Sequence, residues 1–546
     1  MQLDDYQRQH LYGSARFASE EDAQALARGA APIGVLGSTI IRRRRDEPTL
    51  IMGGAGSGKG ANLGLYQPVH DSTGSFLLLD MGGQYLSTTW HYHLAQRREA
   101  YAINVEGASS YPDINHPLNL WGILQPDDPL LLDHARRIAG MAITGEQQGD
   151  NSWVSDGAKR WCARLLVGLV ILDQRVTPAS FWQHVLTLDS DDAYFKHWSR
   201  QLAPETAFSH AFKREVYATA LEIYSKKHHA EKEYGAIMGK LKDDFDWLSS
   251  PSVAASVSGE EDYLAYLPDP RRKVGIYYAL KGGSGQFMES LTRMVVGIAM
   301  MHCTRHHQGK RPLFYLEEAA TCGGAAFIKQ LVSECRKYID TVLVYQSQGQ
   351  LTHLFGRAGA QEIQESCGTQ IILGGGIRDI DSARRYAEMI GRTTVYYDDK
   401  LAQEDRYFKA QEARQNALWQ GDNLFDAERQ YQHEMRQSQR RKRTGRYALD
   451  PAELMRLTDQ VLVFSPGAGI PPVLATKLPA YWQNPAMAGK YAPDPLFPPL
   501  DRVQIQHRLW GKQTKRFIRK TVPDKLAHWP NHINGEIAYV QGYKTW

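Results

Sequence analysis

A glycine-rich stretch at residues 51–64, IMGGAGSGKGANLG, constrains the fold of this chain more than any other segment. It follows the apolar run TLIM (49–52) and precedes ANLGLYQP, which can open a helix. Its spacing is that of the phosphate-binding pattern G-x-x-x-x-G-K-[ST], in which backbone N–H groups at a strand–loop–helix junction converge on phosphates. The alternative is a glycine-rich turn with an exposed lysine, which four glycines in the six positions before the lysine disfavour.

The final position of this pattern departs from the usual one. Gly60 stands where a Ser or Thr hydroxyl usually completes the coordination of Mg²⁺. Because Mg²⁺ keeps several waters and relies on substrate phosphates, this change predicts a weaker or differently filled metal shell, and not the loss of metal. The predicted nucleotide-binding residues are Gly53, Gly54, Ala55, Gly56, Ser57, Gly58, Lys59, Gly60 and Ala61.

Short apolar runs elsewhere in the chain indicate the fold class. Most lack strict alternation, as strands buried on both faces of a parallel sheet do. Helical stretches separate several of them, at 158–172, 288–305, 325–338 and 381–390, which predicts an α/β fold. The predicted strands are TLIM (49–52), SFLLLD (75–80), VGIYYAL (274–280), PLFYLEE (312–318), TVLVYQ (341–346), QIILGG (370–375) and QVLVFS (460–465).

The alternation of strands and helices is interrupted between 126 and 265, where the composition is helical. We interpret this stretch as an all-helical insertion that separates the first two strands from the rest. The predicted organisation is an N-terminal segment (1–48), two parts of a nucleotide-binding domain (49–125 and 266–482) around the helical domain (126–265), and a C-terminal basic tail (483–546). Within the second part, 399–447 is polar and charged and is expected to form an exposed helix or a loop.

Charge and hydropathy limit the class of protein. The formal net charge is only +4, so any basic surface must be local, and two runs qualify: Arg42–Arg45 and Arg440–Arg446. Each is either solvated surface or a contact for phosphates or acidic lipid. Five scattered cysteines without C-x-x-C spacing favour a reducing, cytoplasmic compartment. No apolar run approaches the roughly 18 residues that span a bilayer, so we expect no transmembrane segment in this sequence.

Two further strand ends carry groups suited to nucleotide hydrolysis. The run RPLFYLEEAA brings Glu317 and Glu318 to the end of a predicted strand. In P-loop ATPases with an additional strand, the first acid holds Mg²⁺ and the second polarises the attacking water. Gln346 ends the next strand and could contact the γ-phosphate, and Arg336 could complete a neighbouring subunit's site. The alternative is that these are ordinary polar groups at element ends.

Taken in order, these motifs resemble the TraG/TraD group of type IV secretion coupling proteins, the motor ATPases of conjugation. The resemblance covers about 11–482. It includes YGSARFASEEDAQAL (12–26), GSGKG, LLLDMGGQY, NHPLNLWG (115–122), LEEAATCGG, RKYIDTVLVYQSQGQLTHLFG and RYALDPAELMRLTDQVLVF. The helical insertion also lies where that family has an all-alpha domain.

The resemblance implies a RecA-like P-loop ATPase core with a parallel-rich sheet, which binds ATP and Mg²⁺ and assembles as a homo-hexamer. It implies delivery of DNA (a relaxosome) or protein substrates to a secretion apparatus, and it matches Lys59, Glu317, Glu318, Arg336 and Gln346 to functional positions, with Glu317 at the metal. The sequence departs from the family at Gly82–Gln84, which replaces Lys-Gly-Glu, at Glu317, which replaces Asp, and in lacking the N-terminal transmembrane hairpin. We therefore expect a cytoplasmic protein held peripherally at the inner membrane by partners.

Two other functions fit parts of the pattern. A DNA translocase of the FtsK/HerA type shares the core chemistry, but the YGSARF opening and the helical insertion disfavour it. A non-hydrolysing adaptor, in which a degenerate nucleotide site stabilises a docking platform, is favoured by Gly60 and by the altered residues Gly82–Gln84.

Overall fold

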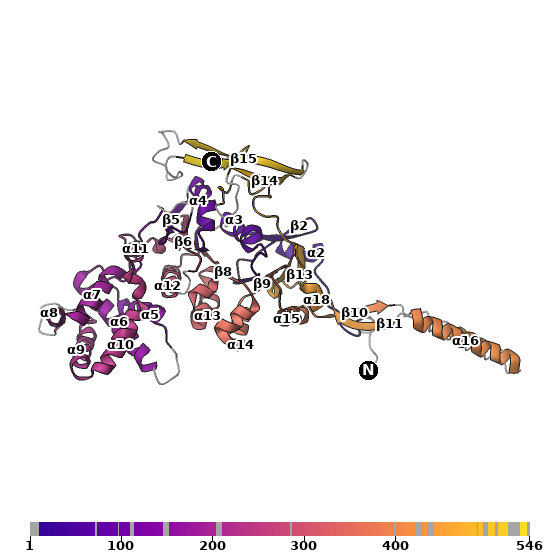
Figure 1. The fold of residues 1–546 in the computed structure, drawn as a ribbon, viewed down its shortest axis with the longest axis horizontal. Coiled ribbons are helices and arrows are strands. Elements are labelled where there is room, and N and C mark those ends of the chain that lie inside the picture. The colour runs from indigo at the N-terminus through magenta and orange to yellow at the C-terminus, as the bar shows by residue number, and fades with distance from the viewer. Residues whose placement is uncertain are drawn as a thin grey trace.

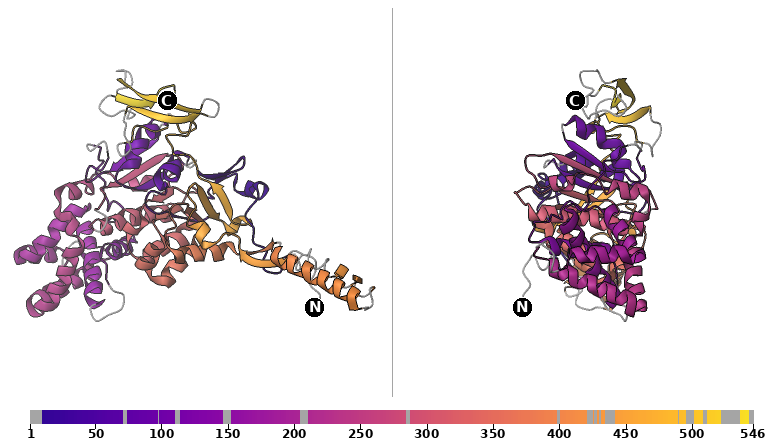
Figure 2. Two further views of the ribbon diagram at one scale, coloured as in Figure 1. Left: turned by 45° about the vertical axis from the view of Figure 1, so that its right-hand side comes forward. Right: turned by 90° about the vertical axis from the view of Figure 1, so that its left-hand side faces the viewer.

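The computed structural model describes residues 10–542, apart from 71–73, 97, 110–113, 146–151, 204–209, 284–286, 398–399, 421–424, 426–427, 430, 434–441, 489, 495–500, 508–510 and 522–535. A large central sheet carries a helical lobe at one end and a small sheet at another edge, and a long arm projects from the far side (Figures 1 and 2).

The central sheet has eleven strands. Its seven strands from β9 to β5 pair in parallel, whereas the pairs from β2 through β13 and β12 to β9 are antiparallel. In spatial order the strands are β2 (Thr39–Arg42), β1 (Pro32–Leu36), β13 (Val473–Thr476), β12 (Gln460–Phe464), β9 (Thr369–Leu373), β3 (Thr49–Met52), β8 (Asp340–Tyr345), β7 (Leu313–Leu316), β4 (Phe76–Met81), β6 (Val274–Leu280) and β5 (Glu99–Ile103).

The order of the central strands brings the predicted motifs together. Strand β8 lies between β3, which leads into the glycine-rich loop, and β7, which leads into the acidic pair. Because all three strands are parallel, their carboxyl ends meet at one edge of the sheet. This arrangement, with one additional strand between the loop strand and the acidic strand, confirms the predicted RecA-like α/β core.

Both faces of the sheet are covered by apolar side chains. Successive residues of a strand point to opposite faces, so Leu50 and Met52 belong to one hydrophobic core and Ile51 to the other. The first core continues without a break into the helical lobe through Trp121 and Trp161. Burial on both faces explains why the central strands show no alternation in sequence.

The helical lobe occupies the region predicted to be helical (Figure 1). Between 131 and 256 the described α-helices are α5 (Leu131–Ala142), α6 (Ser152–Asp173), α7 (Pro178–Ser190), α8 (Asp192–Gln201), α9 (Lys213–His229), α10 (Glu231–Asp244) and α11 (Pro251–Ser256). The prediction that two strands precede it was wrong: β1 to β5 all do. Strand β1 contains Pro and Gly, and three of the five β5 residues are half-buried, so neither forms a clear apolar run.

The remaining elements cover the sheet or extend from it. The α-helices are α2 (Glu20–Ala23), α3 (Tyr66–His70), α4 (Gln84–Ala95), α12 (Glu289–Arg305), α13 (Ala325–Ser333), α14 (Gln348–Ser366), α15 (Ile380–Ile390) and α18 (Pro451–Leu454). The helix predicted to reach residue 338 ends at Ser333, and a 3₁₀ turn at Cys335–Lys337 follows. The predicted strands at 312–318, 370–375 and 460–465 are one to three residues shorter in the structure, and the strand predicted at 341–346 keeps its length but begins one residue earlier, at Asp340.

The described residues of the charged stretch 399–447 form the projecting arm (Figure 1). It contains helix α16 (Lys400–Gln420), as predicted, and it ends in β11 (Lys442–Tyr447), which pairs with β10 (Arg392–Tyr397). The tail, for which no strand was predicted, contributes a three-stranded antiparallel sheet of β14 (Arg502–His507), β15 (Gly511–Thr521) and β16 (Glu536–Val540).

The first basic run does not form the free cationic surface that its sequence suggested. Arg43 is 1% exposed, and it makes a bidentate ion pair with the buried Asp340, with Nη2 2.7 Å from Oδ2. Arg44 pairs with Asp46 and Glu47. Arg42 also donates a hydrogen bond to the Ala30 carbonyl oxygen, at 3.0 Å.

The second basic run is only partly described, since residues 440 and 441 lie outside the described residues. Of the others, Arg446 forms salt bridges with Asp450 and Glu453, and Arg443 stacks over the Tyr396 ring. This run therefore holds the base of the arm together.

The described residues include all five cysteines and the helices whose hydropathy bears on membrane crossing. All five cysteines are buried thiols without a disulfide. Among the helices of the described residues, none combines the length and the hydrophobicity that crossing a bilayer would require.

Candidate nucleotide-binding site

The glycine-rich loop forms a strand–loop–helix junction, as predicted. It leaves β3 at Met52 and enters a π-helical turn, Lys59–Gly64, that continues into α3. Gly58 begins this turn with φ of +88°, and a Cβ there would lie 2.1 Å from the Asn62 side-chain oxygen. Only glycine fits this position, since both the left-handed backbone and the close approach exclude a side chain.

Lys59 folds back over the loop that precedes it. Its ammonium donates hydrogen bonds to the carbonyl oxygens of Gly53 and Gly54. Burial lowers the pKa of this lysine, and the nearby carboxylates of Glu318 and Glu317 oppose that shift. The side chain is therefore held at the loop by carbonyl dipoles and by the acidic pair, where phosphate oxygens can replace the carbonyls as its acceptors.

Glu318 occupies a strained position beside the loop. Its φ and ψ are both 56°, and among the described non-glycine residues only Gln174 shares a positive φ. Such left-handed backbone costs about 1–3 kcal/mol and persists only where surrounding contacts enforce it. Here Gln346 Nε2 donates to one carboxylate oxygen at 2.9 Å and Gln350 Nε2 to the other at 2.5 Å. The left-handed backbone at Glu318 thus places its carboxylate between the two amides, and their hydrogen bonds hold it there.

Gln350 was not predicted from the sequence. It lies in the first turn of α14, and its Oε1 also accepts a hydrogen bond from the backbone N–H of Gln346 at 2.8 Å. The two glutamines therefore form one unit with Glu318. The run YQSQGQ contains both of them, but only the turn from β8 into α14 reveals that the second one faces the same carboxylate.

Glu317 is half-buried and lies near a second carboxylate, that of the fully buried Asp80. Burial raises the pKa of Glu317 to about 8, and the charge of Asp80 adds to this effect. Burial likewise raises the pKa of Asp80 to about 7, although the backbone N–H of Leu86 donates to its Oδ2. One oxygen of each group, Glu317 Oε2 and Asp80 Oδ1, is buried without a hydrogen-bond partner.

The two carboxylates repel each other when both are charged, and a divalent cation between them would remove this repulsion. A bound cation would offset the like-charge repulsion and satisfy an unpaired buried oxygen. No cluster of three His, Cys, Asp or Glu side chains with metal-ligand geometry occurs in the described parts of the chain. Mg²⁺ takes one or two protein carboxylates and completes its shell with waters and substrate phosphates.

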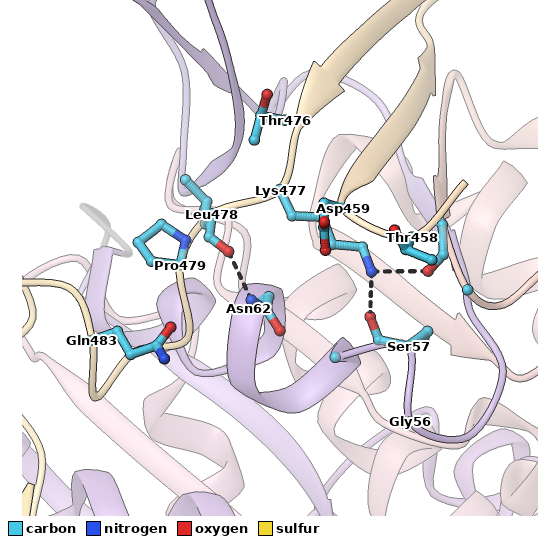
Figure 3. Close-up of a pocket in the computed structure, with 13 residues that line it drawn as sticks. Gly56, Ser57, Asn62, Thr458, Asp459, Thr476, Lys477, Leu478, Pro479 and Gln483 are labelled. Atoms are coloured by element: carbon cyan, nitrogen blue, oxygen red, sulfur yellow. Dashed lines mark hydrogen bonds between the residues drawn. The ribbon is translucent and has the colours of Figure 1, made fainter. Parts of the chain in front are cut away.

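A pocket of about 500 Å³ opens on the other side of the loop (Figure 3). The loop and the segments around Thr458 and Lys477 line it. Lys477 donates to the carbonyl oxygens of Ser57 and Gly374, both at 2.8 Å, and Asn62 Nδ2 donates to the Leu478 carbonyl oxygen at 2.7 Å. These bonds fasten the loop to the segment that follows β13, which the sequence pattern did not predict.

Arg336 is not brought together with the other predicted residues. It is exposed in the 3₁₀ turn that precedes β8, whereas the loop, the acidic pair and Gln346 follow the carboxyl ends of their strands. A six-residue strand is about 20 Å long, so Arg336 lies near the opposite edge of the sheet from the site of its own chain.

Comparison with known proteins identifies the family. The family model for type IV secretory system conjugative DNA transfer matches residues 37–495, and the chain belongs to this family. Over 170 residues it is 27% identical to the type IV secretion system-coupling protein VirD4 of Bartonella henselae and, equally, to that of Bartonella quintana. Each match covers 30% of this chain and 26% of the relative, so only about a quarter of those proteins is spanned.

Solved structures share the fold. The bacterial conjugative coupling protein TrwB, in an N-terminally truncated and unbound form, covers 85% of this chain and 92% of its own, with a TM-score of 0.56 and 13% identity. TrwB in complex with ADP and Mg²⁺ gives a TM-score of 0.55 at the same identity and covers 85% of this chain and 93% of its own. At this identity the likeness supports the RecA-like core with its helical domain, and not the role of any residue.

Proposed function

We propose that this protein is an ATP-hydrolysing coupling protein that recruits DNA or protein substrates and drives them into a type IV secretion or conjugation apparatus. The observation that carries the proposal is the convergence of Lys59, Glu317 and Glu318 at one edge of a RecA-like sheet, with both oxygens of Glu318 held by amides. Membership of the conjugative DNA transfer family supports the role in secretion.

The residues at this edge of the sheet have different roles in hydrolysis. Lys59 and the N–H groups of the loop bind the β- and γ-phosphates. Glu318 accepts a proton from the attacking water as the water oxygen bonds to the γ-phosphorus and ADP leaves. Gln346 and Gln350 hold the carboxylate in position. Because Gln346 donates to Glu318, which acts at the γ-phosphate, its amide can also contact that phosphate when ATP is bound.

Glu317 is the proposed protein ligand of the metal. When bound, Mg²⁺ would supply positive charge that offsets the negative charge developing on the phosphates during transfer. The buried, unpartnered Oε2 of Glu317 is the atom that would hold it. The pocket beside the loop is suited to the nucleoside part of ATP, because it is polar and opens directly onto the glycines.

We further propose that the protein acts as a hexamer. Arg336 is exposed at the sheet edge opposite its own site, as a residue must be if it completes the site of a neighbouring subunit. Partners at the inner membrane would hold the ring at the secretion apparatus. Family membership favours this function over an FtsK/HerA-type translocase that acts outside secretion.

Replacing Lys59 with alanine tests nucleotide binding. Because a hydrogen bond to a charged group contributes about 1.5–3 kcal/mol, we expect ATP affinity to fall roughly ten- to hundredfold in calorimetric titrations. Lys232→Ala, at an exposed position of α10, is the matched control and should bind as the wild type does. Unchanged ATP affinity in Lys59→Ala would contradict the proposed site.

Turnover distinguishes the motor from the adaptor. We expect low ATPase activity from the isolated chain and a rise upon assembly or addition of DNA. A wild-type protein that binds ATP but does not hydrolyse it in any assembled state would instead support the non-hydrolysing adaptor.

A further inference from the structure

The side chain of Gln84 lies next to Gly60, the position at which the usual Ser or Thr hydroxyl is missing. A Cβ placed on Gly60 would lie 3.0 Å from Oε1 of Gln84, which is the nearest atom to it. Gln84 is the first residue of α4. An amide oxygen therefore lies beside the place from which a Ser or Thr side chain would project.

The orientation of the Gln84 amide is determined by its partner. Gln84 Nε2 donates to Asp494 Oδ2 at 2.6 Å, and Tyr481 donates its hydroxyl to the same oxygen at 2.7 Å. Because a carboxylate only accepts, the nitrogen of the amide must face Asp494 and the oxygen must face the loop. Gln84 is 8% exposed and Asp494 is 6% exposed, so both are held inside the protein.

The Tyr85 hydroxyl lies between the surroundings of Gly60 and Glu317, the proposed metal ligand. The Tyr85 hydroxyl is 4.0 Å from the same Gly60 position, and it also lies beside Glu317, where its hydrogen bond lowers the pKa of that carboxyl. Gly60 and Glu317 thus both lie near the Tyr85 hydroxyl, and Gln84 Oε1 lies on the Gly60 side of it. Amide oxygens are hard ligands, of the kind that Mg²⁺ accepts directly or through a water.

We propose that Gln84 Oε1 supplies the metal-directed oxygen that Gly60 removes, and that Asp494 positions it. Asp494 lies in the segment after residue 483, so this segment, for which the sequence indicated no role, contributes to the nucleotide site. The inference rests on the proposed function. It predicts that Gly60 and Gln84 compensate for each other within one metal shell.

The test measures the affinity for ADP with excess Mg²⁺ and with EDTA, together with the binding of Mn²⁺ to the ADP complex by electron paramagnetic resonance. In Gln84→Ala we expect the gain in ADP affinity that Mg²⁺ provides to fall about tenfold or more, with affinity in EDTA unchanged. Asp494→Ala should lose part of the same gain. In Gly60→Ser combined with Gln84→Ala the gain should return, because the new hydroxyl no longer crowds Gln84.

Gln183→Ala is the matched control, since this amide belongs to helix α7 of the helical lobe. Melting temperatures of all variants verify folding. A Gln84→Ala variant that keeps the full Mg²⁺ effect would overturn the inference, and so would an equal loss of ADP affinity in EDTA, which would place Gln84 at the loop and not at the metal. Wild-type protein that binds no ADP in either condition would instead overturn the proposed function, and this inference with it.

Discussion

Replacing Glu318 with glutamine is expected to abolish ATP turnover while leaving ATP binding within a fewfold of the wild-type value. General-base catalysis contributes about 10²–10⁴ in rate, and glutamine cannot accept a proton from water. The replacement has nearly the same shape and the same backbone requirement at φ of 56°, so the loss should arise from the carboxylate and not from a collapse of the turn.

The measurement is steady-state phosphate release by the assembled protein, with and without DNA, together with ATP affinity by calorimetry. Glu388→Gln, at an exposed position of α15, is the matched control and should retain full turnover. A Glu318→Gln variant that hydrolyses ATP at the wild-type rate would show that another group activates the water.

Breaking the ion pair between Arg43 and Asp340 is expected to destabilise the sheet by about 3–5 kcal/mol, because it leaves a charge buried without a partner. The pair joins the segment after β2 to the first residue of β8, and Gln67 of α3 also accepts from Arg43 Nε at 3.2 Å. Removal of Arg43 therefore loosens β8, the strand that leads to Gln346.

Hydrogen exchange of β8 peptides, followed by mass spectrometry, measures the local free energy of opening and avoids the assumption that the whole chain unfolds in one step. In Arg43→Met we expect β8 amides to exchange roughly a hundredfold faster or more. Arg44→Ala should change exchange little, because its pair with Asp46 is partly exposed. The double variant Arg43→Met with Asp340→Leu should recover much of the loss, whereas equal exchange in the single variant and the wild type would contradict the argument.

Features formed by residues close together in the chain were predicted from the sequence, whereas contacts between distant residues were not. The strand–loop–helix context of Lys59, the strand that ends at Glu317 and the helical stretch after residue 126 were all predicted, because each depends on residues close together in the chain. Strands β1, β2, β5 and β13 were missed because they are short and partly exposed, so their apolar signal is weak. The role of Arg42–Arg45 was misjudged because a run of like charges does not reveal a buried partner almost 300 positions away.

The sequence by itself determined that the chain contains a loop with the spacing of a phosphate-binding motif, an acidic strand end and the ordered motifs of one family, because these features are contiguous and can be recognised from residue type and spacing. Only the tertiary structure decided that β8 lies between β3 and β7, that Gln350 shares Glu318 with Gln346, and that Asp494 directs the Gln84 amide toward Gly60. These hydrogen bonds join residues from 28 to 410 positions apart along the chain. Packing and hydrogen bonding in the folded protein bring them together, and no local pattern in the sequence specifies such pairs.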